Sequence, residues 1–421
     1  MSQGIPEPGM TVHMQKKKLN NIDAANYIPL SNADILSQCI AKLKAPDIEK
    51  AKTFFKLVKN QIHLEFHQKI EELDQNYAPF NPNVPNDNVT ADSSELAKNL
   101  KYSLIKANYR ELGQEELDQA FAETSLLKIR LHVDFSDYKQ TILYARGESI
   151  HKEQVALFGK FFKREIEFIN YDSVVMLLHL KADIGDISLE EFCTPGSIVL
   201  KMFQNVPKAD LEMLFPNTKI RMRLKDKFMI GIPALVSGIV IAVTKLGTSF
   251  ILLGTLVGFW LGFSDEPVTL NKTSLLVLLA GFGTLGGYLW KQIRGFKNKK
   301  LEFTQKLTKN LYFRNLDNNE GVYYRLINEA EKEECKEVLL AYFYLLHSNT
   351  VKKPRELDKE LEQWINETWG LTIDFDIEDA MEKLIRLELV KKLDDGFVAL
   401  SLDDAIQNLD RQWDNYFVFK V

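Results

Sequence analysis

Two histidines four residues apart form the first pattern in this chain that could do chemistry. His63 and His67 lie in a segment of helical spacing, so both side chains would point to one side of a helix, as two ligands of a metal ion do. Glu65 is not placed as in the HExxH motif of zinc proteases, and the sequence offers no third ligand nearby. A solvated helix face is the favoured interpretation, and no metal or cofactor is predicted.

A second set of residues that could do chemistry lies where apolar and polar residues begin to alternate along the chain. His132 and Asp134 alternate with apolar residues in one predicted strand, and Arg146 ends the next predicted strand. Arg146 could bind an anion or a partner's carboxylate, and the simpler alternative is a structural ion pair. The chain contains no GxGxxG, Walker or GxSxG motif, so no catalytic residue is predicted and a non-enzymatic role is favoured.

These groups must be positioned by helices followed by a sheet. Residues 1–26 are predicted to be disordered, and residues 27–125 are predicted to be helical, with a long amphipathic helix that begins at Pro46. Residues 126–227 contain short alternating runs, two of which are predicted to be joined by a turn at Tyr171-Asp172. This region is expected to form an α+β domain with an antiparallel or mixed sheet.

The C-terminal residues 331–421 show the order helix, helix, helix, two strands, helix, after a predicted helical connector at 292–330. Pro354 begins the second of these helices, and Asp376 can cap the third. The order is that of a winged-helix-like domain, in which the third helix would read DNA. On this helix acidic residues outnumber Lys383 and Arg386, and phosphate binding needs a positive surface. Nucleic acid is therefore not an expected partner.

Two charge-free apolar runs, 246–263 and 273–290, are bracketed by dense Lys and Arg. This pattern predicts a transmembrane hairpin over 245–291, in contact with the lipid bilayer and with both basic flanks and both termini in the cytoplasm. A third run, 228–244, is predicted to be an interfacial or re-entrant helix. The predicted fold class is thus an α+β membrane protein. It has an N-terminal helical and mixed-sheet cytosolic region, a transmembrane helical hairpin and a C-terminal winged-helix-like domain.

The hairpin carries two further sets of residues. Six are expected at the membrane interface: Lys245, Trp260, Tyr288, Trp290, Lys291 and Arg294. Five glycines at four-residue spacing are expected to allow close helix packing, either between the two arms or between copies of the chain: Gly254, Gly258, Gly262, Gly283 and Gly287.

Composition supports a mainly globular protein. Of the 421 residues, 45% are hydrophobic and 26% are charged, with a net charge of −5. The three cysteines are Cys39, Cys193 and Cys335. Because they show no CxxC spacing, a reducing compartment is expected.

Several short motifs, taken in their order along the chain, resemble a known family. They are Tyr27-Ile28-Pro29-Leu30, Tyr144-Ala145-Arg146-Gly147, the run Val206 to Pro216, Leu311-Tyr312, Glu337 to Phe343, Asp374-Phe375-Asp376 and Trp413-Asp414. This order resembles the transmembrane-protein-143-like family. The resemblance implies a two-span membrane protein, mitochondrial in animals and also present in bacteria, without an established activity or catalytic residues. Since residues 1–20 lack the character of a mitochondrial presequence, a bacterial inner membrane is favoured.

The leading functional hypothesis is a membrane-anchored, non-enzymatic scaffold that recruits a protein partner or forms a homo-oligomer. One alternative is an enzyme with an unfamiliar site in the sheet domain, near Arg146, Asp134 and His132. The other alternative is an oligomeric membrane conduit, which the absence of ionisable residues inside the two runs disfavours.

Overall fold

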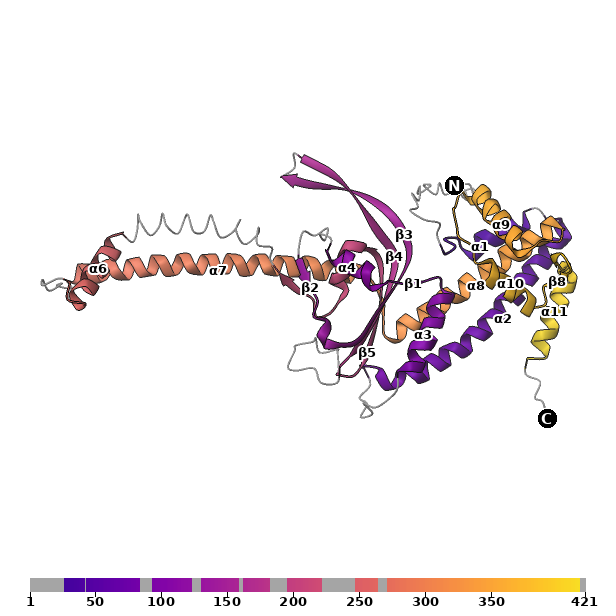
Figure 1. Ribbon diagram of the computed structural model, residues 1–421, viewed down its shortest axis with the longest axis horizontal. Coiled ribbons are helices and arrows are strands. Elements are labelled where there is room, and N and C mark those ends of the chain that lie inside the picture. Colours follow the sequence, from indigo (N-terminus) through magenta and orange to yellow (C-terminus); the bar gives the residue numbers. More distant parts are fainter. Residues whose placement is uncertain are drawn as a thin grey trace, which may run out of the picture.

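An antiparallel sheet of five strands lies between a layer of helices and a long helical arm (Figure 1). The computed structural model describes residues 26–41, 43–83, 93–122, 130–158, 162–181, 195–221, 247–263 and 271–416. The sheet order is β1-β3-β4-β5-β7. Its strands are β1 (Arg110–Glu111), β3 (Tyr138–Phe158), β4 (Phe162–Leu180), β5 (Ile198–Pro207) and β7 (Asn315–Asn318). Smaller elements on this side are β2 (Arg130–His132), β6 (Lys219–Arg221), η2 (Phe135–Asp137) and η3 (Lys208–Leu214).

The turn predicted at Tyr171-Asp172 is wrong, because β4 is one continuous strand through these residues. Tyr171 pairs with Glu148 on one side and with Val206 on the other. The irregularity lies instead on β3, where Gly147 has a φ of +73°. A Cβ atom at Gly147 would lie 2.6 Å from Asp172 Oδ2, so only glycine leaves room for the Asp172 side chain.

Successive side chains of a strand point to opposite faces of the sheet. Alternate residues of β3 and β4 therefore belong to two different cores, one on each face. On one face, Tyr144, Val175 and Leu177 join the larger core, which the helices α2 (Ala45–Tyr77), α3 (Ser94–Lys106) and α8 (Glu320–Ser348) complete. On the other face, neighbouring residues in the same strands join a second core with α4 (Gln114–Ala122) and η3. The sheet therefore ties two cores together.

Helix α8 is the centre of the helical layer and is buried along most of its length. It packs against α1 (Asn32–Ile40), α2, α3, α9 and α10. The ring of Tyr342 on α8 stacks on Phe54 of α2 with ring centroids 4.3 Å apart. The N-terminal helices and the C-terminal segment thus share one core, although some three hundred residues separate them in sequence.

The C-terminal elements follow the predicted order. Helix α9 (Pro354–Trp369) begins at Pro354, and the Asp376 side chain accepts a hydrogen bond from the backbone N–H of Asp379 at 3.0 Å, which caps α10 (Ile377–Arg386). The hairpin of β8 (Val390–Leu393) and β9 (Gly396–Ala399) and the helix α11 (Leu402–Asp414) complete the segment. The helical connector predicted at 292–330 consists of the end of α7 and the start of α8, with the short strand β7 between them at the edge of the sheet.

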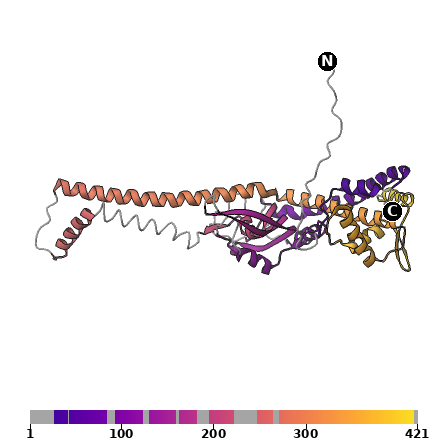
Figure 2. The same cartoon turned by 90° about the horizontal axis from the view of Figure 1, so that it is seen from above.

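The predicted membrane hairpin corresponds to α6 (Gly247–Trp260) and α7 (Lys272–Arg314), which lie side by side and extend away from the sheet (Figures 1 and 2). Helix α6 has 14 residues, about 21 Å at 1.5 Å per residue, against a hydrocarbon core of about 30 Å. The second predicted span is only the first part of α7, which continues through Lys291 and Arg294 as one helix of 43 residues.

Within the residues that the structure describes, none of the helices is both long enough and apolar enough to cross a bilayer. This finding contradicts the predicted class of a multi-pass membrane protein and its predicted place in a bacterial inner membrane or a mitochondrial membrane. The predicted interfacial or re-entrant helix at 228–244, and Lys245, lie outside the described residues.

The residues that were predicted to lie at a membrane interface or to pack two helices together are mostly exposed in the structure. Trp260 and Trp290 are 86% and 67% exposed, Lys291 and Arg294 are exposed, and Tyr288 is half-buried. Gly262 has a φ of +76°, and the Phe263 N–H donates to the Gly258 carbonyl at 2.8 Å, so Gly262 ends α6 as a left-handed cap. A Cβ atom at any of the five glycines would meet nothing within 4 Å, so the predicted packing of the two arms on these glycines is absent from the described residues.

Candidate functional site

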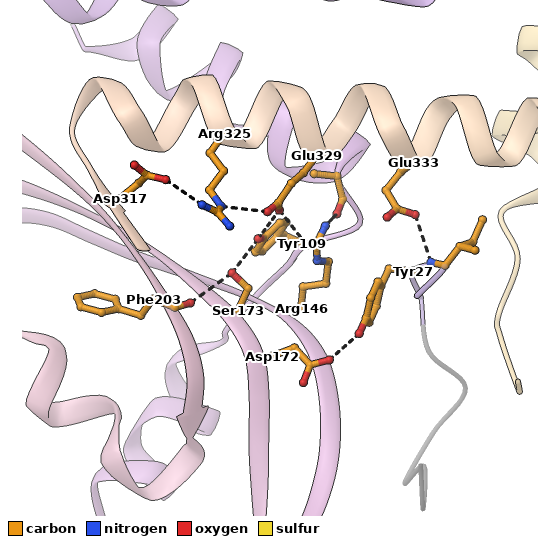
Figure 3. A network of polar contacts seen from close by, with 12 residues as sticks. Tyr27, Tyr109, Arg146, Asp172, Ser173, Phe203, Asp317, Arg325, Glu329 and Glu333 are labelled. Carbon is orange, nitrogen blue, oxygen red and sulfur yellow. Dashed lines mark hydrogen bonds and ion pairs between the residues drawn. The ribbon is translucent and has the colours of Figure 1, made fainter. Parts of the chain in front are cut away.

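Arg146 lies at the junction of the sheet and the helical layer (Figure 3). It projects from β3 toward α8, where its Nη2 lies 2.8 Å from Glu329 Oε2. Its Nη1 donates a hydrogen bond of 3.0 Å to the carbonyl of Ala107, directly after α3. The same Glu329 oxygen accepts a hydrogen bond from the Tyr109 hydroxyl at 2.8 Å, and the Tyr109 hydroxyl oxygen lies 2.9 Å from Ser173 Oγ on β4. Arg146 thereby joins three elements.

Two aromatic rings cover the Arg146 guanidinium. Its Cζ lies 4.6 Å from the ring centroid of Tyr109 and 5.1 Å from that of Tyr27, which are cation–π distances. The Tyr27 hydroxyl donates to Asp172 Oδ2 at 2.5 Å, on the far side from α8. The two motifs Tyr27-Ile28 and Tyr144 to Gly147, distant in sequence, therefore meet at this arginine.

The segment that begins with Tyr27 is also held on α8. Glu333 Oε2 accepts the Ile28 N–H at 3.2 Å, and Lys336 Nζ donates to the Ile28 carbonyl at 2.6 Å. Glu333 and Lys336 are themselves paired at 2.7 Å and nearly fully buried. Both backbone polar groups of Ile28 thus have charged partners, which makes these hydrogen bonds stronger than neutral ones.

The electrostatics of the Arg146 network keep the arginine charged. Burial alone would lower the pKa of Arg146, but coulombic attraction to Tyr109, Glu329 and Glu333 raises it above its usual value. Burial likewise raises the pKa of Tyr109, so this hydroxyl remains a hydrogen-bond donor. Because the Arg146 donors have partners inside the chain and both its faces are covered, the geometry favours a structural ion pair over an anion-binding arginine.

The structure does not bring the three predicted candidates together. His132 lies on β2, opposite Lys219 of β6, in a separate two-stranded sheet. The Asp134 side chain accepts a hydrogen bond from the Ser136 N–H at 3.1 Å, and its carbonyl accepts one from Asn217 Nδ2 at 2.6 Å. Arg146 is at the middle of the large sheet. A common site of these residues, as the enzyme hypothesis requires, is not formed.

The two histidines remain a solvated pair. His63 and His67 have ring centroids 6.3 Å apart, and their side chains are 61% and 57% exposed. His63 Nδ1 lies 2.9 Å from Glu331 Oε2, and His67 Nε2 lies 3.7 Å from Glu71. No set of three metal ligands that includes either histidine occurs in the described part of the chain.

A second polar centre, which the sequence did not reveal, is buried where α3, α8 and α10 meet. Lys383 Nζ of α10 lies 2.7 Å from Glu334, 2.5 Å from Glu337 and 2.5 Å from Asp379. Lys106 Nζ of α3 lies 2.5 Å from Asp379 and 3.3 Å from Glu334. We call these five residues the Lys383 cage. Two features of the sequence could have indicated this cage. Asp379 and Lys383 are spaced at i,i+4, and Glu334 and Glu337 are spaced at i,i+3 on α8.

The three carboxylates of the Lys383 cage are arranged as ligands of a metal ion could be, and the ammonium group of Lys383 lies between them. Oxygen atoms of Glu334, Glu337 and Asp379 lie within 4.8 Å of one another, close enough to hold a cation. Lys383 Nζ lies instead at hydrogen-bond distance from all three carboxylates, where such a cation would bind. A cavity of about 500 Å³ borders the cage, between α2, α3 and α10.

Charges in the Lys383 cage do not balance, and this shifts the pKa values. Three carboxylates face two ammonium groups. Burial raises the pKa of Glu337 to about 7 in spite of Lys383, and burial also raises the pKa of Glu334. For Lys383, burial is outweighed by the attraction of Glu337, Glu334 and Asp379, which raises its pKa. The cage therefore holds Lys383 as a cation, while burial favours the protonated form of Glu337 and Glu334.

The Lys383 cage also bears on nucleic-acid binding. The two basic side chains expected on the reading helix are both engaged inside the chain: Lys383 is buried in the cage, and Arg386 Nη1 pairs with Glu65 of α2 at 2.7 Å. Helix α10 thus directs these charges toward the core and α2, which agrees with a structural or protein-contact role for this segment.

Comparison with protein families gives a match over part of the chain. A family model described as a protein of unknown function (DUF3754) matches residues 171–321. The match runs from β4 through the α6–α7 arm to the start of α8, and it leaves out Arg146, the Lys383 cage and the C-terminal segment from α9 to α11. No solved structure matches the chain.

Proposed function

We propose that this protein is a non-enzymatic scaffold that self-associates through its α6–α7 arm. The observation that carries the proposal is the apolar surface of this arm. Its large exposed side chains include Ile251 (70%), Trp260 (86%), Leu276 (66%), Leu279 (63%) and Trp290 (67%). Large apolar side chains that are exposed on one arm in this way are typical of an interaction site.

The sheet and the helical layer, from which the arm extends, support a scaffolding role rather than a catalytic one. Arg146 joins the sheet to α8, and the Lys383 cage joins α3, α8 and α10. Such buried charge networks fix the relative positions of elements. A fixed body is what a scaffold needs to present an arm in one direction (Figure 2).

A second copy of the chain is the partner that the arm fits best. Gly254 and Gly258 on α6, and Gly283 and Gly287 on α7, have open space where a Cβ atom would be. Glycines at four-residue spacing let a helix backbone approach another helix closely. Since the described part of α6 carries no charged residue, it has no electrostatic selectivity for a foreign partner.

The oligomeric state of the full chain tests this proposal. Sedimentation equilibrium of the natural chain should give a multimer, and the double variant Leu276→Glu/Leu279→Glu should be shifted toward the monomer. Gly258→Leu should have the same effect, because a side chain at this open position blocks close approach without meeting atoms of its own chain. Ile105→Glu, at an exposed apolar position of α3, is the matched control and should associate like the natural chain.

The contact itself can be captured with a cysteine. On a Cys193→Ser background, Gly258→Cys should form a disulfide between two copies under mild oxidation, since Cys39 and Cys335 are buried. A monomeric natural chain would contradict the proposal. A second contradicting result would be that the chain floats with phosphatidylcholine vesicles and that Gly258→Cys no longer crosslinks in their presence. Lipid rather than a second copy would then cover the arm.

A further inference from the structure

A cavity of about 370 Å³ lies between α3 and the sheet, apart from the Arg146 network and the Lys383 cage. Its apolar walls come from both elements. Leu100 and Leu104 line it from α3, while Ile142, Val175 and Leu177 line it from β3 and β4. Ile142 is paired with Leu177, and the side chains point the same way because both lie on the face that joins the larger core.

The polar residues of this cavity are gathered mainly on α3 and β1, and they favour an anion. Lys98 and Lys101 of α3 line the cavity with Glu111 of β1, so two of the charged residues that line it are cationic and one is anionic. Lys101 Nζ is 3.7 Å from Glu111, and Lys98 Nζ is 3.8 Å from Glu95. Both separations are longer than a hydrogen bond, so each ammonium group can still take a hydrogen-bonding partner.

The Glu111 carboxylate has a second partner that reduces its effect on an incoming anion. Its Oε2 accepts a hydrogen bond from the Tyr144 hydroxyl at 3.1 Å. Burial, with Glu111, raises the pKa of Tyr144 to about 12, so this hydroxyl stays protonated and donates to Glu111. Lys98 is then the most available charge at the cavity, with a side chain that is 75% exposed and able to move.

We propose that this cavity binds an amphipathic anion, with an unbranched alkyl tail between α3 and the sheet and a carboxylate at Lys98 and Lys101. The apolar walls favour the tail because they remove methylene groups from water. The pair of ammonium groups selects an acidic head over a basic or neutral one. A volume of several hundred cubic ångströms lined by apolar side chains with a few polar groups is typical of small-molecule sites.

The binding can be measured with the full chain and a fluorescent undecanoate analogue as the probe. Dodecanoate should displace the probe at a concentration at least about tenfold lower than dodecylamine does. Lys98→Glu/Lys101→Glu should weaken dodecanoate binding about tenfold or more and leave dodecanol binding nearly unchanged. The matched control Lys391→Glu/Lys392→Glu, which changes two exposed lysines of β8, should bind dodecanoate like the natural chain.

Filling the cavity tests its location. Ala97 lies on α3 and lines the cavity, so Ala97→Trp should reduce probe binding by about tenfold or more. Ile142→Trp places the same bulk on the sheet side, and unfolding curves of both variants show whether they fold. Leu276→Glu/Leu279→Glu should bind the probe normally, because the arm is not the site.

Three results would overturn the proposal. The first is equal displacement by dodecanoate and dodecylamine. The second is unchanged probe binding in folded Ala97→Trp and Ile142→Trp. The third is loss of binding in the arm variant alone, which would place the probe on the exposed apolar surface instead.

Discussion

Glu337 Oε2 on α8 and Lys383 Nζ on α10 lie 2.5 Å apart, and both residues are almost fully buried, with 4% and 3% of their surface exposed. The pair holds α10 of the C-terminal segment on α8, the central helix of the layer. A buried ion pair of this kind is costly to break, because a single remaining charge has no water to solvate it.

Lys383→Met should destabilise the protein strongly. The substitution leaves Glu334, Glu337 and Asp379 buried with only Lys106 to compensate them, and removing one member of a buried pair costs about 3–5 kcal/mol. Urea unfolding monitored by circular dichroism measures the free energy of unfolding. Lys391→Met, at an exposed position of β8, is the control and should change it by less than about 0.5 kcal/mol. Equal stability of the two variants would mean that the cage contributes nothing.

A divalent cation should stabilise Lys383→Ala but not the natural chain. Without the ammonium group, the three carboxylates of the cage are within reach of one cation. Calcium or manganese at a hundredfold excess over its Kd would add about 2.7 kcal/mol, visible as a higher melting temperature. Lys383→Ala/Glu334→Gln has one ligand charge fewer and should respond less. An equal response of the natural chain would show that the ion binds elsewhere.

Arg146→Lys should be destabilising although it keeps the charge. A lysine has no planar group to lie between the rings of Tyr27 and Tyr109, and it cannot reach Glu329 and Ala107 with the same geometry. A loss of about 1–3 kcal/mol in the free energy of unfolding is expected. A double-mutant cycle of Arg146→Met and Glu329→Gln should give a coupling energy between about 0.5 and 3 kcal/mol. Additive effects would show that this ion pair is energetically silent.

The Glu212 carboxyl group should make the melting temperature of the protein depend on pH, and Glu212→Gln should remove this dependence. Burial in η3 raises the pKa of Glu212 to about 7. A carboxyl group with a raised folded-state pKa favours folding when it is protonated, so its contribution is complete below about pH 4.5 and is lost as the pH rises to about 7. Melting temperatures across this window should fall more in the natural chain than in Glu212→Gln. Glu378→Gln, at an exposed position, should behave like the natural chain.

Local signals in the sequence located the helix ends well. Ser31 accepts a hydrogen bond from the Asp34 N–H and begins α1, Pro46 opens α2, and Asp376 caps α10. Each signal works because a capping side chain or a proline acts on backbone groups within the same turn. Such interactions need no knowledge of the rest of the chain.

The sheet was harder to predict. β4 continues through Tyr171 and Asp172 because Glu148 and Val206 flank it on neighbouring strands, and residues such as Asp look like turn formers in isolation. β7 becomes an edge strand only because β5 lies beside it. Strand pairing is a long-range choice, and a short sequence window does not contain the partner.

The sequence by itself determined the apolar stripes, the helix caps and the order of elements in the C-terminal segment, because periodicity and capping are local properties. It also singled out Arg146, but without its partners. Only the tertiary structure decided that Arg146 is covered by Tyr27 and Tyr109, that Lys383 fills a ligand set on α8, and that α6 is a short helix in an exposed arm. The reason is physical: what a charge or an apolar face does depends on the groups that surround it, and folding brings those groups from distant parts of the chain.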